Sequence, residues 1–168
     1  TLERPERVNN LVLMSASGAP VKEESLPPMA LRAMKNPFGR FLISRIWSRS
    51  MAKKSLEDMV FDGSSITDEE IDRMWDFSIY PGNMDAMFQE FRETWAAFDP
   101  ADIKEITTNT LLIWGKEDSI CPESMGIWYD SHLPNSTMVV IPNIGHNPHF
   151  ECPNRCSDEI SSWLAALT

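Results

Sequence analysis

Carboxylate and imidazole side chains follow two short apolar runs in the second half of the chain. Glu117 and Asp118 come just after the run NTLLIWG at 109–115, and His146 comes just after the run STMVVIPN at 136–143. If these runs are neighbouring parallel strands, their carboxyl ends lie at one edge of the sheet, where the sites of such sheets form. A carboxylate that accepts a hydrogen bond from one imidazole nitrogen leaves the other nitrogen as a general base. The pattern therefore predicts an acid–base pair.

The elements that would position this pair follow an alternating order. A third apolar run, VNNLVLMSA at 8–16, ends in small residues and Gly18, as a buried strand does. All three runs are continuously apolar, which is typical of parallel strands covered on both faces. An apolar helical stripe separates the second and third runs, and another follows Pro153. This order predicts an α/β fold, with a mainly parallel sheet and flanking helices.

The stretch from about residue 18 to 82 contains no convincing strand. Prolines interrupt it, and FGRFLISRIWSRSM carries several apolar residues on one helical face. Thr67 and Glu70 have the spacing of a capping box, which predicts the start of a helix. A further helix is expected from Asn83, with an apolar stripe that runs to Trp95. The stretch is therefore interpreted as a helical insertion between two strands of the sheet.

Four parts of the chain, in this order, resemble the C-terminal part of the α/β-hydrolase family. RPERVNNLVLMSASG resembles the segment after the family's nucleophile helix, and the helical stretch that follows lies where the family inserts a cap. LLIWGKEDSICP resembles the family's acid turn, which favours Asp118 over Glu117. IPNIGHNPHFECP resembles its Gly-His-x-Pro turn, which favours His146 over His149.

This resemblance implies a partial α/β-hydrolase fold. The core is expected at 1–18 and 83–168, and the inserted helical cap at 19–82. The family's triad has the order nucleophile, acid, histidine along the chain. Asp118 is therefore expected to orient His146, and His146 to take a proton from the nucleophile. No cofactor and no metal is implied.

The nucleophile that such a triad needs is absent from the sequence. The family's elbow has the pattern Gly-x-Ser-x-Gly, and no five residues of the chain fit it. SASG at 15–18 lacks the first Gly and follows the wrong strand, and Ser124 comes after the acid. The resemblance places the elbow, with Ser as the expected nucleophile, before Thr1. We therefore expect the chain alone to be inactive and to need the missing N-terminal part of the same protein.

The resemblance implies a small-molecule substrate, with an ester as the first expectation. The cap is similar to those of esterases and of hydrolases that cleave carbon–carbon bonds in ring-fission dienoates. The dienoate enzymes usually have Trp after the catalytic His and an Arg–Trp pair in the cap, whereas this chain has Asn147 and the order Arg73-Met74-Trp75. The dienoate substrate is therefore the alternative. Apolar cap residues are expected to shape the substrate pocket: Phe38, Phe41, Trp47, Met74 and Trp75.

Charge and cysteine content restrict the partners and the compartment. The net charge is −10, so the sequence offers no basic surface for nucleic acid or for anionic membranes. No apolar run has the length of a membrane span. Three cysteines do not indicate a secreted disulfide framework, which favours the cytoplasm. Nothing in the sequence indicates the oligomeric state.

Two other interpretations compete with the hydrolase. One is a zinc site formed by four residues of ligand type: His146, His149, Cys152 and Cys156. These residues lie within eleven positions, whereas structural zinc sites usually join two separated segments. The other interpretation is a non-catalytic α/β binding domain, in which Asp118 would only shape a turn and His146 would be a core residue. The placement of both residues after consecutive strands favours the enzyme.

Overall fold

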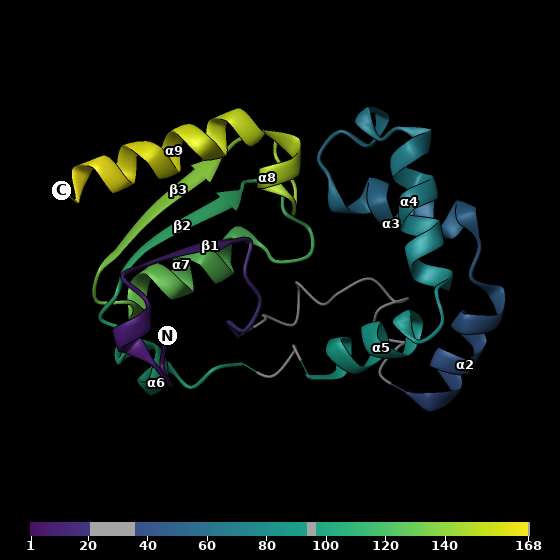
Figure 1. The fold of residues 1–168 in the computed structure, drawn as a ribbon, viewed down its shortest axis with the longest axis horizontal. Helices are drawn as coiled ribbons and strands as arrows, with labels where there is room; N and C mark the ends of the chain where they lie inside the picture. The colour runs from purple at the N-terminus through teal and green to yellow at the C-terminus, as the bar shows by residue number, and fades with distance from the viewer. Residues whose placement is uncertain (21–35, 94–96, 168) are drawn as a thin grey trace.

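A parallel three-stranded sheet forms the centre of the structure, a computed structural model that describes residues 1–20, 36–93 and 97–167. Its strands are β1 (Asn10–Met14), β2 (Asn109–Gly115) and β3 (Ser136–Ile141), in the order β1-β2-β3 (Figure 1). The elements around it are η1 (Pro5–Arg7), α6 (Pro100–Lys104), α7 (Glu123–His132), α8 (Pro148–Glu151) and α9 (Pro153–Ala166). The predicted α/β fold with a parallel sheet is confirmed.

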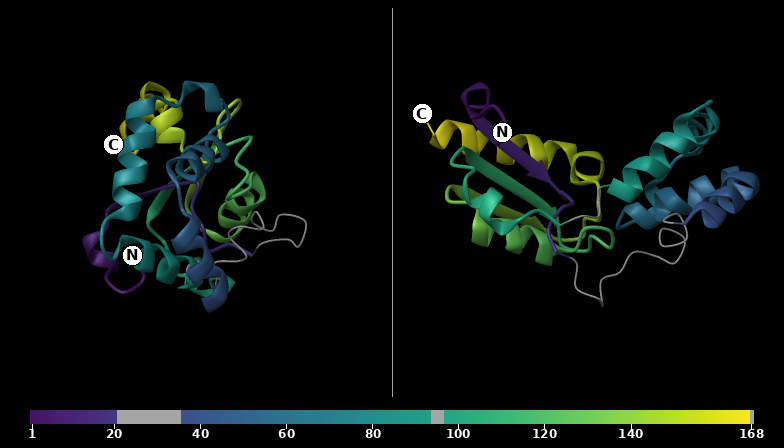
Figure 2. Two further views of the ribbon diagram at one scale, coloured as in Figure 1. Left: turned by 90° about the vertical axis from the view of Figure 1, so that its right-hand side faces the viewer. Right: turned by 90° about the horizontal axis from the view of Figure 1, so that it is seen from below.

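The central strand β2 is buried on both faces. Every residue of β2 except the first is buried, and alternate side chains point to opposite faces. Leu112 and Trp114 pack in a core with residues of α7, whereas Leu111 and Ile113 pack in a second core with residues of α9. Helices α7 and α9 accordingly cover opposite faces of the sheet (Figures 1 and 2). This two-sided burial explains why the run is continuously apolar.

The strand β1 is shorter than the apolar run that predicts it. The run extends from 8 to 16, but β1 ends at Met14. Ser15 has a φ of 44°, in the left-handed region, which is incompatible with extended backbone. The chain therefore leaves the sheet earlier than hydrophobicity alone indicates.

A second group of elements is entirely helical. It contains α2 (Pro37–Ile46), α3 (Arg49–Met59), η3 (Gly63–Ser65), α4 (Asp68–Ile79) and α5 (Asn83–Glu93). The capping box at the start of α4 is confirmed, because the Glu70 amide donates to Thr67 Oγ1 and the Thr67 amide donates to the Glu70 carboxylate. Ile43 of α2 and Phe88 of α5 form a small core of their own. Trp95 lies outside the described residues.

The helical group lies beside the carboxyl ends of the strands (Figure 1). Three hydrogen bonds join it to the turns at that edge: Ser119 Oγ to the Asp58 carbonyl, the His146 amide to the Met59 carbonyl, and the Phe61 amide to the Glu151 carboxylate. The boundaries of core and cap at 18 and 82 stay predictions. None of the helices within 1–20, 36–93 and 97–167 has both the length and the apolar character to span a membrane.

Candidate active site

The turn after β2 holds the Asp118 carboxylate in the interior. Asp118 is 5% exposed, and its Oδ1 accepts hydrogen bonds from two backbone amides, those of Ile120 at 2.9 Å and Cys121 at 2.8 Å. These donors compensate a buried charge and fix the direction of the carboxylate. The turn thus places a rigid acceptor at the carboxyl end of the central strand.

His146 faces this carboxylate from the neighbouring turn. Its Nδ1 lies 3.0 Å from Oδ2 and 3.2 Å from Oδ1 of Asp118. Because an ionised carboxylate only accepts, Nδ1 is assigned as the donor, and the lone pair of a neutral imidazole is then on Nε2. The side chain of Asp118 is fully buried, whereas that of His146 is 23% exposed. The pair therefore has the arrangement of a general base oriented by a buried acid.

Glu117, the second carboxylate of the acid turn, has a different partner. Its Oε2 accepts from the Ile144 amide at 3.2 Å, and its own amide donates to the Ile144 carbonyl at 3.1 Å. Glu117 therefore joins the two turns through backbone groups. Of the two carboxylates that follow β2, Asp118 is the one directed at His146.

The backbone around His146 is closely packed. A Cβ added at Gly145 would stand 2.8 Å from the carbonyl oxygen of Met59 and 2.8 Å from the amide nitrogen of Phe61. Asn143 has a φ of 58°, in the left-handed region that Asn tolerates better than most residues. The close approach of the backbone thus explains the glycine at 145, and the left-handed conformation explains the asparagine at 143.

Glu151 contacts the same turn, although no sequence pattern singles it out. Its carboxylate accepts from the amides of Gly145 and Asn147, on either side of His146, and from the amide of Phe61 in the helical group. The only signal in the sequence is an acidic residue shortly after the His turn. Hydrophobic periodicity carries no information about a carboxylate that turns back onto backbone amides.

A cavity of about 390 Å³ lies between the helical group and the His turn. Asn147, the residue after His146, lines it, as does Met74, one of the five predicted pocket residues. The complete lining consists of Leu56, Val60, Ile66, Glu70, Arg73, Met74, Phe77, Asn147, His149 and Phe150. The cavity is mostly apolar, and Arg73, His149 and Glu70 are its ionisable residues.

The other predicted pocket residues do not line this cavity. Trp47 donates through Nε1 to Ser78 Oγ at 2.7 Å and packs beside Ile43 and Phe88. Trp75 is half-buried on α4. Phe38 and Phe41 are 75% and 58% exposed on α2. Their role in substrate binding stays a prediction.

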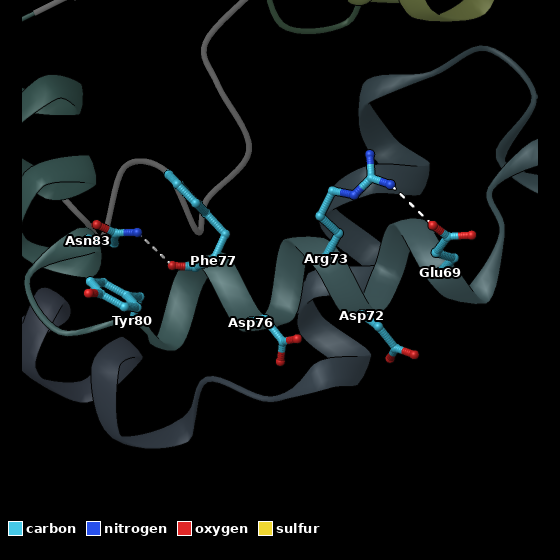
Figure 3. Close-up of a pocket in the computed structure, with 7 residues that line it drawn as sticks. All are labelled: Glu69, Asp72, Arg73, Asp76, Phe77, Tyr80 and Asn83. Carbon is cyan, nitrogen blue, oxygen red and sulfur yellow. Dashed lines mark hydrogen bonds and ion pairs between the residues drawn. The ribbon is translucent and has the colours of Figure 1, made fainter.

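A wider hollow of about 550 Å³ lies along one face of α4 (Figure 3). It is lined by Glu69, Asp72, Arg73, Asp76, Phe77, Tyr80 and Asn83. Arg73 pairs with Glu69 at 3.2 Å, and Asn83 Nδ2 donates to the Phe77 carbonyl at 2.9 Å (Figure 3). All residues that line this hollow lie between 69 and 83, and none comes from the turns after β2 and β3. The 390 Å³ cavity, by contrast, is lined by Asn147, the neighbour of His146, so we assign only that cavity to the acid–base pair.

The residues of the zinc interpretation are divided between different contacts. His146 pairs with Asp118, and His149 lines the 390 Å³ cavity. The sulfur atoms of Cys152 and Cys156 are 3.9 Å apart. Within the described part of the chain, no group of three or more His, Cys, Asp or Glu side chains could hold a metal ion.

Cys121 is a buried thiol beside the acid turn. Burial, assisted by the negative charge of Asp118, raises the pKa of Cys121 to about 12. A thiol reacts as the thiolate, so Cys121 is protonated and unreactive at neutral pH. It is a core residue, packed with Trp114 and Met125.

Comparison with known families agrees with this fold. The family model of the alpha/beta hydrolase fold matches residues 1–153, and the chain belongs to that family. The uncharacterized hydrolase YugF of Bacillus subtilis is 29% identical over 167 residues, which cover 97% of this chain and 59% of that protein. A 2-hydroxy-6-oxononadienedioate/2-hydroxy-6-oxononatrienedioate hydrolase of Paraburkholderia xenovorans is 24% identical over 169 residues, covering 98% of this chain and 56% of that protein.

A solved structure shows the same fold. The meta-cleavage product hydrolase from Pseudomonas fluorescens IP01 superposes with a TM-score of 0.78 at 24% identity, over 99% of this chain and 59% of that one. The chain therefore spans less than two thirds of the length of each of these proteins. The expected partial α/β-hydrolase fold is confirmed.

Proposed function

We propose that this chain supplies the acid and the base of a hydrolase that transfers an acyl group to water. The observation that carries the proposal is the 3.0 Å contact between His146 Nδ1 and Asp118 Oδ2, after the adjacent strands β2 and β3. His146 takes a proton from the nucleophile, and Asp118 orients the imidazole and stabilises the imidazolium. The scheme uses no metal and no cofactor.

The nucleophile, for which we propose a serine, belongs to an N-terminal part of the same protein. The greater length of the relatives supports this, because the chain spans 59% of YugF. The sheet supports it as well: β1 is an edge strand, and within the described residues its outer edge has no partner strand. A preceding strand that pairs there would bring its own carboxyl end to the edge that carries Asp118 and His146.

The reaction then proceeds in two steps. The serine oxygen attacks the substrate carbonyl carbon and gives its proton to His146, which passes that proton to the leaving group as the bond to it breaks. A water molecule next attacks the acyl-enzyme, His146 takes its proton, and the proton returns to the serine oxygen as the acid is released.

The substrate is proposed to bind under the cap predicted at 19–82, of which the helices α2, α3 and α4 are described; α5 packs against α2 and α4. The cavity of about 390 Å³ between this group and the His turn supports the proposal, since small-molecule sites commonly have about 300–1,000 Å³. Its apolar lining favours an ester with an apolar acyl or aromatic group. The three cysteines are free, which suits the reducing cytoplasm as the compartment.

A carbon–carbon bond hydrolase of ring-fission dienoates is the second candidate. The relative from Paraburkholderia xenovorans carries the name of such an activity. Arg73 and His149 in the cavity are cationic or ionisable groups that an acidic substrate could contact. Asn147 and Met74 occupy the positions at which this chain departs from the pattern of dienoate enzymes, so the ester remains first.

The test requires the complete protein. Determining the coding sequence before the codon for Thr1 shows whether an in-frame Gly-x-Ser-x-Gly precedes this chain. The full-length product is then assayed with aromatic and aliphatic esters and with a dienoate. An in-frame start codon without an elbow would leave the non-catalytic binding domain as the better interpretation.

The role of His146 is tested in the same protein. We expect His146→Ala to lower kcat by several orders of magnitude, as removal of a triad member does. His149→Ala is the matched control, because His149 lines the cavity whereas the Asp118 carboxylate pairs with His146; it should change KM more than kcat. Near-normal turnover of His146→Ala would exclude the assignment.

A further inference from the structure

Three backbone N–H groups converge on the carboxylate of Glu151. Oε1 lies 3.0 Å from the amide nitrogen of Gly145 and 3.2 Å from that of Asn147. Oε2 lies 2.9 Å from the amide nitrogen of Gly145 and 2.7 Å from that of Phe61. Gly145 and Asn147 are the two neighbours of His146, so Glu151 holds the backbone on both sides of the proposed base.

The third donor belongs to a different part of the molecule. Phe61 and Glu151 are 90 positions apart in the sequence, and Phe61 follows the end of α3 in the helical group. The segment at 58–61 also contacts the pair directly, because the carbonyl of Met59 accepts from the amide of His146 at 2.8 Å. The segment therefore holds His146 in two ways: the amide of His146 donates to the Met59 carbonyl, and the amide of Phe61 donates to Glu151, which in turn binds the neighbours of His146.

The acid turn is joined to the same segment. Ser119, the residue after Asp118, donates through Oγ to the carbonyl of Asp58 at 3.1 Å. Gly145 also lies directly against this segment, because a Cβ there would stand 2.8 Å from the carbonyl carbon of Val60. Acid, base and helical group thus meet at one short stretch of backbone.

A carboxylate suits this position because of its acceptor geometry. An ionised carboxylate has two acceptor oxygens and no donor, so all three N–H groups are satisfied at once. Hydrogen bonds to a charged acceptor are also stronger than those to a neutral one. An amide side chain would present an N–H₂ group to at least one of the three donors.

We infer that Glu151 is a positioning residue that couples the helical group to the general base by tying Phe61 to the turn around His146. A movement of the segment at 58–61 is then transmitted to the imidazole. The substrate cavity adjoins this coupling on both sides, since Val60 and Asn147 both line it. The role of His146 as a base rests on the proposed function. The hydrogen bonds of Glu151 to the backbone around His146 and to Phe61 are observed independently of it.

The first experiment compares Glu151→Gln with Glu159→Gln in the complete protein. Glu159 lies on α9 and pairs with Arg155, so its replacement removes a charge of the same kind away from the His turn. In Glu151→Gln we expect amide hydrogen exchange of Phe61, and of at least one of Gly145 and Asn147, to become about ten-fold faster. The ring ¹⁵N shifts of His146 should move from the Nδ1–H tautomer toward the average of both tautomers.

The Glu159→Gln variant should leave both signals unchanged. A purely structural role of Glu151 would lower overall stability without a specific change in the His146 ring shifts. The inference is overturned if Glu151→Gln leaves the exchange of Phe61 and the ring shifts of His146 as in the unchanged chain.

A second pair of variants removes the donor instead of the acceptor. Phe61→Pro deletes the N–H group that binds Glu151, and Phe61→Ala deletes the ring but keeps that group. Val60 has φ −114° and ψ 158°, the extended conformation that a residue before Pro adopts. We expect Phe61→Pro, compared with Phe61→Ala, to alter the ring shifts of His146. Identical His146 spectra of the two variants would overturn the coupling.

Kinetics of the complete protein separate this inference from the proposed function. If hydrolysis is observed, Glu151→Gln should lower kcat about ten- to hundred-fold with a smaller change in KM, because a small displacement of a catalytic group has an effect of this size. An unchanged kcat with an active enzyme refutes the positioning role alone. Absence of hydrolysis, together with the spectral changes in Glu151→Gln, refutes the proposed function alone.

Discussion

The backbone of Gly115 lies directly against the carbonyl group of Gly145, so close that a Cβ added at Gly115 would overlap the Gly145 oxygen. Gly115 is the last residue of β2 and begins the turn that carries Asp118, and Gly145 precedes His146. The separation of the acid and the imidazole is therefore set by contact between two turns, in addition to the side-chain hydrogen bond.

Gly115→Ala should separate these turns. The added methyl group must displace backbone, and overpacking of this kind costs about 1–3 kcal/mol of the free energy of unfolding. We expect a lower midpoint in urea and a weaker contact between Asp118 and His146, visible in the imidazole ¹⁵N shifts. Gly63→Ala is the control, because a Cβ there would come no closer than 3.1 Å to another atom, the Cβ of Glu57, whereas at Gly115 it would overlap the Gly145 oxygen. Equal midpoints for the two variants would contradict the prediction.

Asp118→Asn should impair the base while preserving the turn. The amide oxygen of Asn can still accept from the amides of Ile120 and Cys121, as Oδ1 of Asp118 does. Its N–H₂ group then faces Nδ1 of His146 and favours the tautomer protonated on Nε2, which cannot accept a proton there. In the complete enzyme we expect kcat to fall about 10⁴-fold, the effect of this replacement in a serine protease triad, with little change in the urea midpoint. A loss below ten-fold would show that Asp118 does not orient the base.

The proximity of Asp118 and His146 could be predicted because it follows from topology. Each residue comes just after an apolar run, and adjacent parallel strands bring such positions to one edge. The contact of Phe61 with Glu151 could not be predicted in this way. It joins residues 90 positions apart through a backbone amide, which any residue except proline provides, so the sequence contains no pattern for it.

The predicted substrate pocket illustrates a second limit. Apolar stripes on helices show which face avoids water, but they do not show against which partner that face packs. Met74 lines the cavity, Trp47 packs within the helical group, and Phe38 and Phe41 are exposed in this chain. Whether an apolar residue lines the cavity, packs between helices or is exposed depends on how the helices are arranged. The periodicity of a single helix does not determine that arrangement.

The stability of the chain should fall in alkaline solution. Burial raises the pKa of Cys121 to about 12, with a further contribution from the charge of Asp118, and burial raises the pKa of Tyr129 to about 12 as well. In the unfolded chain these groups titrate near about 8.5 and about 10. The stabilisation is therefore complete below about pH 8.5 and is lost as the pH rises toward the folded values, because the unfolded state releases its protons first.

Urea unfolding between about pH 7.5 and 10.5 measures this dependence. Cys121→Ala should flatten the decrease in part, because burial raises the pKa of Cys156 to about 12 as well and that thiol remains. A midpoint that does not change with pH in the unchanged chain would exclude a protonated, buried Cys121.

The outer edge of β1 should make this chain self-associate in isolation. The residues of β1 are exposed or only half-buried, whereas those of β2 are nearly all buried, so the strand presents backbone groups and apolar surface at the edge of the sheet. Unpaired strand edges and exposed apolar faces promote pairing between chains. We expect sedimentation velocity to show a weight-average mass that rises with concentration, and we expect the complete protein to remain at a constant mass at the same concentrations. A monomer of the 168-residue chain at all concentrations would mean that β1 needs no further strand, and it would weaken the proposal that an N-terminal part pairs there.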